Sequence, residues 1–234
     1  VCVQGLWHLG SVTAGCLASL GHDVTGFDFD NQTIANLQKG TLPVSEPGLK
    51  ALIEDGVTKG NLRFTENVRD AVSDVQVLWV TYDTPVDDDD QANVSFVLQE
   101  IRKTLPLLED NTIILVSSQL PVGSIRQLEE IALKECPDKN ISFCCSPENL
   151  RLGKALGVFL HPDRVIMGVR HEEARDVLCE LFEGITENIV WMSVESAEMT
   201  KHAINAFLGM SVTFINEIAA ICENVGADAR EVEA

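Results

Sequence analysis

Residues 1–10, VCVQGLWHLG, decide the fold of this chain. The first four residues suit the end of a buried strand, and residues 8–20 are small and apolar, as in a buried helix. Between them, Gly5 and Gly10 occupy the outer positions of G-x-G-x-x-G, the turn that binds dinucleotides. Trp7 stands at the middle position, where the pattern has no side chain. Taken alone, the turn fits an ordinary glycine-rich connection as well as a dinucleotide site.

Beyond this turn, apolar runs alternate with helical patterns. Continuous apolar runs are typical of strands that are covered on both faces. The predicted strands are residues 23–27, 62–65, 75–81, 111–117, 141–145 and 164–169, and the predicted helices are residues 31–38, 49–54, 94–108 and 124–134. This alternation predicts an α/β fold with a doubly wound, Rossmann-like parallel sheet.

The pattern changes at about residue 194. Residues 196–225 contain no proline and one internal glycine, and they greatly exceed the roughly 11-residue average helix. They predict a long helix that ends at Gly226, a plausible C-terminal cap. We therefore expect a Rossmann-like domain over residues 1–193 and the start of a central helical domain over residues 194–234.

Composition narrows the choice of partners. The formal net charge is -19, which argues against a nucleic-acid partner because phosphate binding needs a basic face. We see no apolar run that approaches the roughly 20 residues needed to cross a bilayer, and no secretory leader. The seven cysteines form no C-x-x-C pair, so we interpret them as reduced core thiols. The expectation is a cytoplasmic protein without a membrane or nucleic-acid partner.

Asp28 strengthens the dinucleotide interpretation. It follows the second predicted strand, roughly 20 residues after the glycines, where an acid bonds the ribose hydroxyls. Its charge would repel a 2′-phosphate, so NAD is favoured over NADP. The alternative is that Asp28 caps the helix from Asn31 onward, although Asp30 could serve that role instead.

Three later predicted strands end in polar, proline-containing segments: residues 81–85, 117–123 and 146–151. In open parallel sheets the ligand lies beyond the carboxyl ends of the strands, so we expect these segments to share one cleft. Glu148 is the best single acid there and could act as a general base. The alternative for Glu148 is a helix cap.

Lys201 and Asn205 are four residues apart on the predicted long helix and share a face, on which Glu198 also lies. Without further context, a solvated salt bridge is the default interpretation. The acidic run of residues 87–90 suits a solvated loop. It lacks the ligand spacing of a metal site, and we predict no metal.

Together these motifs resemble the UDP-glucose/GDP-mannose dehydrogenase family, over essentially the whole chain. The resemblance rests on the order and spacing of GLWHLG (5–10), GTLPVSEPGL (40–49), VTYDTPVDDDDQANVSFV (80–97), SSQLPVGS (117–124), SPENLRLGKAL (146–156), HPDRVIMG (161–168) and AEMTKHAINAFLGMSVTFINEIAAICENVGAD (197–228). The resemblance implies a Rossmann-like NAD domain, a long central helix used in homodimerisation, and a C-terminal domain that holds the nucleotide-sugar.

The resemblance also implies an activity: oxidation of the 6-hydroxymethyl group of a UDP- or GDP-linked sugar to a carboxylate, with two NAD per substrate, in polysaccharide biosynthesis. In this family the aldehyde is trapped on a cysteine, oxidised to a thioester and hydrolysed. The implied catalytic residues are Glu148, Lys201 and Asn205, with Lys201 and Asn205 steadying the oxyanion or assisting proton removal. The implied NAD-binding residues are Gly5, Trp7, Leu9, Gly10, Asp28, Thr84 and Gln119.

Several positions depart from the family pattern. Trp7 replaces the middle glycine, Leu152 stands where many members carry a second glutamate, and Gln119 occupies a position that is usually threonine. The family's nucleophilic cysteine is expected in a glycine-rich motif beyond Ala234, so we expect a truncated fragment that is inactive alone. Two alternatives stay open: a two-electron dehydrogenase of the hydroxyacid or 6-phosphogluconate type, and a module that only binds the cofactor.

Overall fold

An eight-stranded sheet organises the part of the chain that the structure describes, residues 1–89, 91–148 and 150–233, with Glu233 described by its backbone alone. The structure is a computed structural model. The strands are β1 (Cys2–Gln4), β2 (Val24–Phe27), β3 (Leu62–Thr65), β4 (Val77–Val80), β5 (Ile113–Val116), β6 (Ser142–Cys145), β7 (Val165–Gly168) and β8 (Ile189–Met192). Four of them, β2, β4, β5 and β1, are buried along their whole length, as their apolar runs predict.

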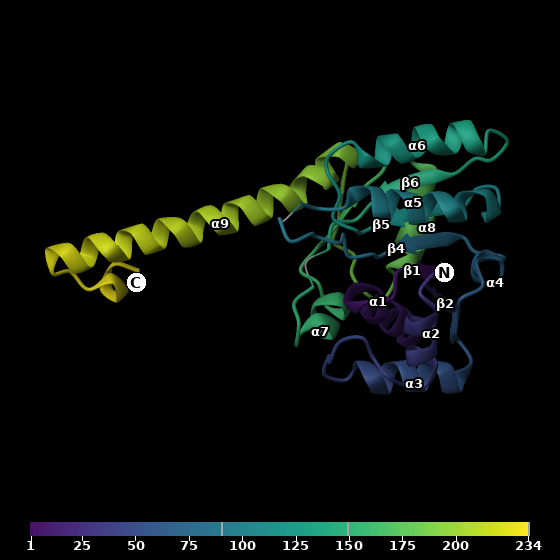
Figure 1. Cartoon of the computed structure of the whole chain (residues 1–234), viewed down its shortest axis with the longest axis horizontal. Coiled ribbons are helices and arrows are strands. Elements are labelled where there is room, and N and C mark those ends of the chain that lie inside the picture. Colours follow the sequence, from purple (N-terminus) through teal and green to yellow (C-terminus); the bar gives the residue numbers. More distant parts are fainter. Residues whose placement is uncertain (90, 149, 234) are drawn as a thin grey trace. The chain divides into compact units, whose positions relative to one another are not determined.

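The strand order is β3-β2-β1-β4-β5-β6-β7-β8 (Figure 1). All neighbouring strands are parallel except β6 and β7, which meet in one antiparallel pair of residues, Cys145 and Gly168. The chain runs outward from β1 to β3 and then returns to place β4 on the other side of β1. This reversal between β1 and β4 is the point at which doubly wound sheets bind ligands.

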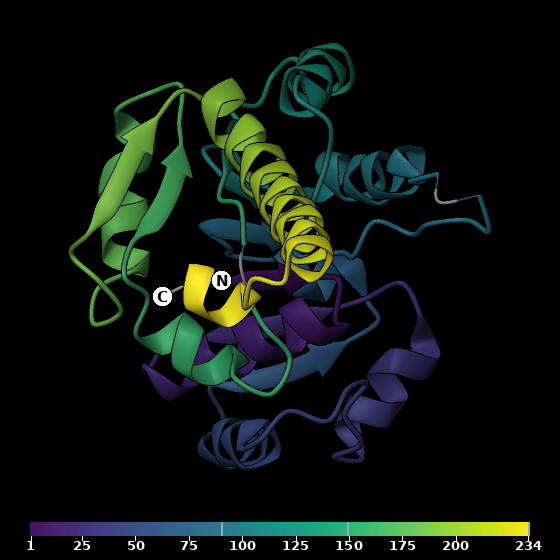
Figure 2. The ribbon, with the colours of Figure 1, turned by 90° about the vertical axis from the view of Figure 1, so that its left-hand side faces the viewer.

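Helices cover both faces of the sheet. One core cluster joins the sheet to α1 (His8–Ser19), α2 (Asn31–Gln38), α3 (Leu49–Lys59), α7 (Ala155–Leu160) and α8 (Glu173–Leu181). The other joins the sheet to α4 (Val68–Val72), α5 (Val94–Thr104), the 3-10 turn η1 (Leu105–Leu107) and α6 (Ser124–Glu135). Figure 2 shows α1 and α3 on one side of the sheet and α5 and α6 on the other.

The predicted fold class is confirmed, with local differences. The helix predicted over residues 94–108 is α5 followed by η1, because Pro106 cannot donate the backbone hydrogen bond that would continue the α-helix. The helices α4, α7 and α8 and the strand β8 were not predicted, and the antiparallel pairing of β6 and β7 was not foreseen. These segments are short, so they show little periodicity.

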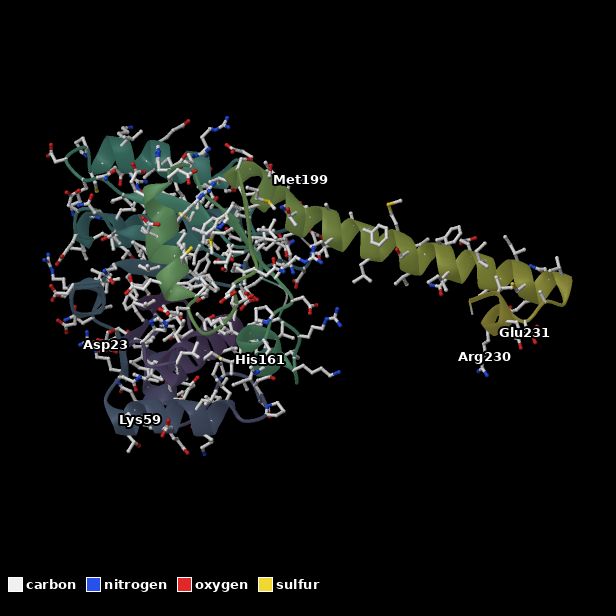
Figure 3. The ribbon with its side chains drawn as sticks, turned by 180° about the vertical axis from the view of Figure 1, so that it is seen from behind. Asp23, Lys59, His161, Met199, Arg230 and Glu231 are labelled. Carbon is white, nitrogen blue, oxygen red and sulfur yellow. The ribbon has the colours of Figure 1, made fainter. Side chains whose placement is uncertain are left out.

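The long helix is α9, Val194–Val225, 32 residues, followed by α10 (Ala229–Glu233). Gly226 adopts φ +73°, and the Ala227 N–H donates to the Cys222 carbonyl, so the predicted glycine cap is confirmed. The chain divides into two compact units, residues 1–198 and residues 199–234. In Figure 3 the side chains beyond Met199 project outward around α9.

The expectation that no apolar run reaches membrane-spanning length is wrong for α9. By length and composition alone, this helix is long and apolar enough to cross a bilayer. A helix that buries its surface against another protein can have the same length and the same apolar composition. Exposed large apolar side chains of α9 beyond Met199 include Phe207, Leu208, Met210, Phe214, Ile215 and Ile221.

Candidate functional site

The turn between β1 and α1 is built around two glycines. Gly5 adopts φ +97°, and a Cβ atom there would lie 2.7 Å from the Tyr82 ring. A Cβ atom on Gly10 would lie 1.8 Å from the Gly5 carbonyl oxygen and 2.7 Å from Thr81 Oγ1. Only glycine therefore lets α1 begin so close to β1 and β4, which is the packing role of the last glycine in the dinucleotide pattern.

The first turn of α1 remains open toward a ligand. Its N-cap residue, Trp7, makes no side-chain capping hydrogen bond, and the first turn contains no acidic residue. Helix N-termini of this kind attract phosphate groups through their backbone N–H groups. The Trp7 side chain is 55% exposed, so the indole lies outside the core instead of filling the turn, and Leu9 is partly buried.

Asp28 lies beside this turn. One of its carboxylate oxygens accepts from the Leu6 N–H at 2.8 Å, and the other accepts from the Asp30 N–H at 3.0 Å. Asp30 caps α2 by accepting from the Gln32 and Thr33 N–H groups, so Asp28 is not the helix cap. Burial raises the pKa of Asp28, and its hydrogen bonds to the Asp30 and Leu6 N–H groups oppose that rise.

The polar segments after β4 and β5 lie side by side, as predicted. Thr84 Oγ1 donates to the Gln119 carbonyl oxygen at 2.6 Å, while the Gln119 residue itself is exposed. Ser118, immediately before Gln119, is 7% exposed, and its hydroxyl has no hydrogen-bond partner among the described residues. Buried hydroxyl groups normally have a partner, so this one suits a site that binds a polar ligand.

A buried chain of hydrogen bonds connects the ends of four strands. Trp79 Nε1 on β4 donates to Ser117 Oγ at 2.9 Å, and Ser117 Oγ donates to the Ser146 carbonyl oxygen at 2.7 Å. Ser146 Oγ donates in turn to the Ile166 carbonyl oxygen at 3.0 Å. These hydrogen bonds fix the alignment of the ends of β4, β5 and β6, and they attach β7 to them.

Glu148 is partly buried in the segment that follows β6. No helix begins directly after it in the described residues, since α7 starts only at Ala155, so a cap role is not supported. Burial and, secondarily, the charge of Glu148 raise the pKa of the Cys16 thiol to about 12, so the carboxylate lies within electrostatic range of α1. The neighbouring Leu152 is 66% exposed.

Glu198 has a role that sequence reasoning missed. Its two oxygens accept from the Gly123 N–H at 2.7 Å and the Ile125 N–H at 2.9 Å, and the residue is 4% exposed. It therefore caps α6 and holds the segment that contains Gln119. In the sequence, the only indication that α6 needs a cap from elsewhere is Gly123 before its first residue, because glycine has no side chain that could cap the helix.

Lys201 and Asn205 are one helical turn apart on α9 and belong to the second unit. Lys201 is partly buried, and Asn205 is exposed. Their predicted convergence with Glu148, which belongs to the first unit, stays a prediction.

The remaining expectations concern metals and thiols. Asp87, Asp88 and Asp89 are exposed, as expected of a solvated loop, and Asp90 lies outside the described residues. All seven cysteines are free thiols, and six are buried. Among the described residues no cluster of metal-ligating side chains occurs.

The features of the sheet edge define a class of protein. The doubly wound sheet, the glycine turn at its reversal point, the open start of α1 and the acid after β2 together make a Rossmann-type dinucleotide-binding domain.

Comparisons with known proteins identify the family. Residues 1–186 match the NAD binding domain of the UDP-glucose/GDP-mannose dehydrogenase family, and residues 195–234 match its central domain. The chain belongs to this family. UDP-glucose 6-dehydrogenase of Rhizobium meliloti (strain 1021) is 36% identical, over 97% of this chain and 54% of that protein.

Two solved structures are similar over 99% of this chain. A ternary complex of GDP-mannose dehydrogenase from Pseudomonas aeruginosa superposes with a TM-score of 0.91 at 28% identity, and the match covers 55% of that chain. A UDP-glucose dehydrogenase from Pyrobaculum islandicum superposes with a TM-score of 0.90 at 28% identity, covering 54% of that chain. The chain spans about half the length of the curated relatives that it matches.

NAD is the cofactor of this domain, and the residues present fit it. The cradle at Gly10 has no room for a Cβ atom, the first turn of α1 is open to phosphate, and the Asp28 carboxylate stands beside the turn.

Proposed function

We propose that this chain forms the NAD-binding part of an NAD-dependent nucleotide-sugar 6-dehydrogenase. Such an enzyme converts the 6-hydroxymethyl group of a UDP- or GDP-linked sugar to a carboxylate, with two NAD per substrate, in polysaccharide biosynthesis. The observation that carries the proposal is the glycine turn at the reversal point of the sheet, bonded to Asp28. The family match along the chain supports the same substrate class.

The coenzyme residues follow from the edge of the sheet. The N–H groups at the start of α1, around Leu9 and Gly10, hold the pyrophosphate, and Asp28 accepts from the adenosine ribose hydroxyls. Thr84 and Gln119, joined by their hydrogen bond, line the nicotinamide side. Asp28 already accepts two backbone N–H bonds, and its remaining lone pairs can accept from the ribose.

The catalytic roles follow from the chemistry of alcohol oxidation. NAD, when held by these residues, would supply the acceptor for the hydride that leaves the hydroxymethyl carbon. Loss of that hydride requires removal of the hydroxyl proton and stabilisation of the oxygen, for which Lys201 and Asn205 supply a cation and an amide. Glu148 activates the water that hydrolyses the later thioester.

Four of the six buried thiols, those of Cys2, Cys16, Cys144 and Cys145, do not suit the nucleophile of that thioester. Burial is the largest cause that raises the pKa of each to about 12, which keeps the thiol protonated at neutral pH. We therefore expect the chain alone to bind NAD and to form no carboxylate product from UDP-glucose or GDP-mannose.

The assembly and the compartment are also proposals. The exposed apolar side chains of α9 support a homodimer formed through this helix, in which a partner chain would cover the apolar surface of a helix that also has the length and composition of a membrane span. A cytoplasmic location without membrane or nucleic-acid partners is consistent with the reduced cysteines and the net charge of -19.

Titration calorimetry of this chain tests the coenzyme proposal. NAD⁺ should bind, and NADP⁺ should bind at least about tenfold more weakly because Asp28 repels the 2′-phosphate. Asp28→Asn should bring the ratio of NAD⁺ affinity to NADP⁺ affinity closer to one. Asp55→Asn on α3, whose side chain is 50% exposed, should leave the ratio unchanged. Equal affinity of the wild type for the two coenzymes would contradict the role of Asp28, and absence of NAD⁺ binding would overturn the proposal.

A further inference from the structure

Glu46 is a buried carboxylate that the proposed chemistry does not use. It lies between α2 and α3, in the GTLPVSEPGL segment, and its side chain is 1% exposed. An ionised carboxylate is costly to bury unless hydrogen bonds replace its water. The Glu46 carboxylate has those bonds, and the groups of His8, Gly153 and Ala155 that form them belong to segments far away in the sequence.

Two of these partners lie at the end of the segment that connects β6 to α7 and at the first residue of α7. Glu46 Oε2 accepts from the Gly153 N–H at 2.9 Å, and Oε1 accepts from the Ala155 N–H at 2.9 Å. The N-cap residue of α7, Lys154, makes no side-chain capping bond, so Glu46 supplies the cap from another part of the chain. The connecting segment also contains Glu148, the proposed general base.

The third partner lies in the coenzyme turn. His8, the first residue of α1, places Nε2 3.1 Å from Glu46 Oε2, and its side chain is only 12% exposed. Oε2 thus faces the His8 ring and the Gly153 N–H at the same time. A displacement of His8 changes the contacts of the oxygen that also holds the Glu148 segment.

The charges around this contact support an ionised Glu46. Burial alone would raise the pKa of Glu46, but the hydrogen bonds from Gly153, His8 and Ala155 outweigh it, so the pKa is lowered. The charge of His8 also reaches Asp83, after β4: burial raises the pKa of Asp83, and His8 partly offsets that rise. His8 therefore lies between acids of two different segments.

Close packing of α1 against α3 restricts the relative movement of His8 and Glu46. A Cβ atom on Gly15 of α1 would lie 3.1 Å from Leu49 and 3.3 Å from Ile53 of α3, so the two helices are in close contact. Glu46 lies three residues before α3, and Gly48 starts that helix with φ +85°. A shift at the start of α1 therefore reaches Glu46 directly through His8.

We infer that Glu46 is a positioning residue that couples NAD binding at the Gly5–Gly10 turn to the order of the segment that contains Glu148. The inference rests on the proposed coenzyme site. Coupling of this kind is reciprocal: NAD stabilises the Glu46 contacts to Gly153 and Ala155, and those contacts strengthen NAD binding.

Amide hydrogen exchange of this chain, with and without saturating NAD⁺, tests the coupling. In the wild type, NAD⁺ should slow exchange at Gly153 and Ala155. Glu46→Gln places an amide nitrogen against an N–H donor, so exchange at both amides should become about tenfold faster and should no longer respond to NAD⁺. NAD⁺ affinity should fall by about fivefold to tenfold. Glu54→Gln on α3, whose side chain is 58% exposed, is the matched control and should behave as the wild type.

A pair of His8 variants separates coupling from capping. His8→Phe removes the donor but leaves the two backbone bonds of Glu46, so the NAD⁺-dependent slowing should disappear. His8→Gln keeps a nitrogen donor near the position of Nε2 and should restore it. This pair also provides the test if Glu46→Gln fails to fold.

Three results would overturn the inference. Faster exchange in Glu46→Gln with wild-type NAD⁺ affinity would make Glu46 a helix cap only. Wild-type slowing in His8→Phe would show that the coupling does not pass through His8. Absence of NAD⁺ binding by the wild type would overturn the coenzyme site itself, and this result is distinct from the other two.

Discussion

At the scale of single residues, Trp7 is the largest departure from the dinucleotide pattern. The glycine normally found there lets the backbone approach the pyrophosphate. The indole is 55% exposed, so the turn keeps its fold while it carries a bulky group at its rim. We therefore expect the Trp7 side chain to weaken ligand binding and to leave the stability of the protein unchanged.

We predict that Trp7→Gly tightens NAD⁺ binding by about tenfold, because the pyrophosphate can then approach the backbone of the turn. Titration calorimetry measures the change. Trp191→Phe on β8 removes a different indole and should leave the affinity unchanged. An equal or weaker affinity of Trp7→Gly would show that the indole contributes contacts to the coenzyme.

At the scale of elements, an ion-pair network joins α6, the end of β7 and the start of α9. Arg170 Nε lies 2.6 Å from Glu129, and Arg126 and Arg170 lie 2.6 and 3.0 Å from Glu195. The hydrogen bonds from Arg170 and then from Arg126 lower the pKa of Glu195 to about 2. The Glu195 side chain is 28% exposed, so solvent screens the network only in part.

This network predicts a pH-dependent stability. The pKa of Glu195 is lower in the folded chain than its ordinary value of 4.5, so its contribution is complete above pH 4.5 and is lost as the pH falls toward 2. Urea unfolding should therefore show a difference between wild type and Glu195→Gln at pH 7 that shrinks below pH 4.5. The exposed, non-titrating change Leu133→Ala on α6 should give a constant difference. A Glu195→Gln difference that stays constant down to pH 2.5 would contradict the shift.

The elements also show what a sequence can predict. Apolar runs and the glycine turn predicted β1 to β7 and the doubly wound fold class, because strands covered on both faces have no polar alternation, whereas the strand order was not predicted. The buried carboxylates Glu46 and Glu198 were not assigned their roles. Their partners are backbone N–H groups 73 to 109 residues away, and backbone donors are present at nearly every residue, so they carry no sequence signal. The segments that contain Thr84 and Gln119 were expected to lie together, and a hydrogen bond joins them because β4 and β5 are neighbours; the role of the two residues in binding NAD stays a prediction.

At the scale of the whole molecule, the two units differ in how much apolar surface they bury. The first unit has a core on both faces of the sheet. On α9, Phe207 and Phe214 are 72% and 66% exposed and lie seven residues apart, on one face of the helix. Exposed apolar surface of this kind is typical of an interface between protein chains.

We predict that the chain is a dimer at micromolar concentration and that the double change Phe207→Glu and Phe214→Glu makes it a monomer. Sedimentation velocity measures both states. Asn216→Glu introduces a single charge of the same sign on a different face of α9 and is the control. A monomeric wild type, or co-flotation of the wild type with phosphatidylcholine vesicles, would contradict the dimer.

The hydrogen-bonded chain that starts at Trp79 also gives the protein an intrinsic optical signal. Of the three tryptophans, Trp79 alone is completely inaccessible to solvent, and its ring nitrogen donates to Ser117 at the strand ends. Emission from such an indole lies at shorter wavelength than emission from the solvated Trp7. Fluorescence therefore distinguishes loosening of the strand ends from events at the glycine turn, and it does so without any attached dye.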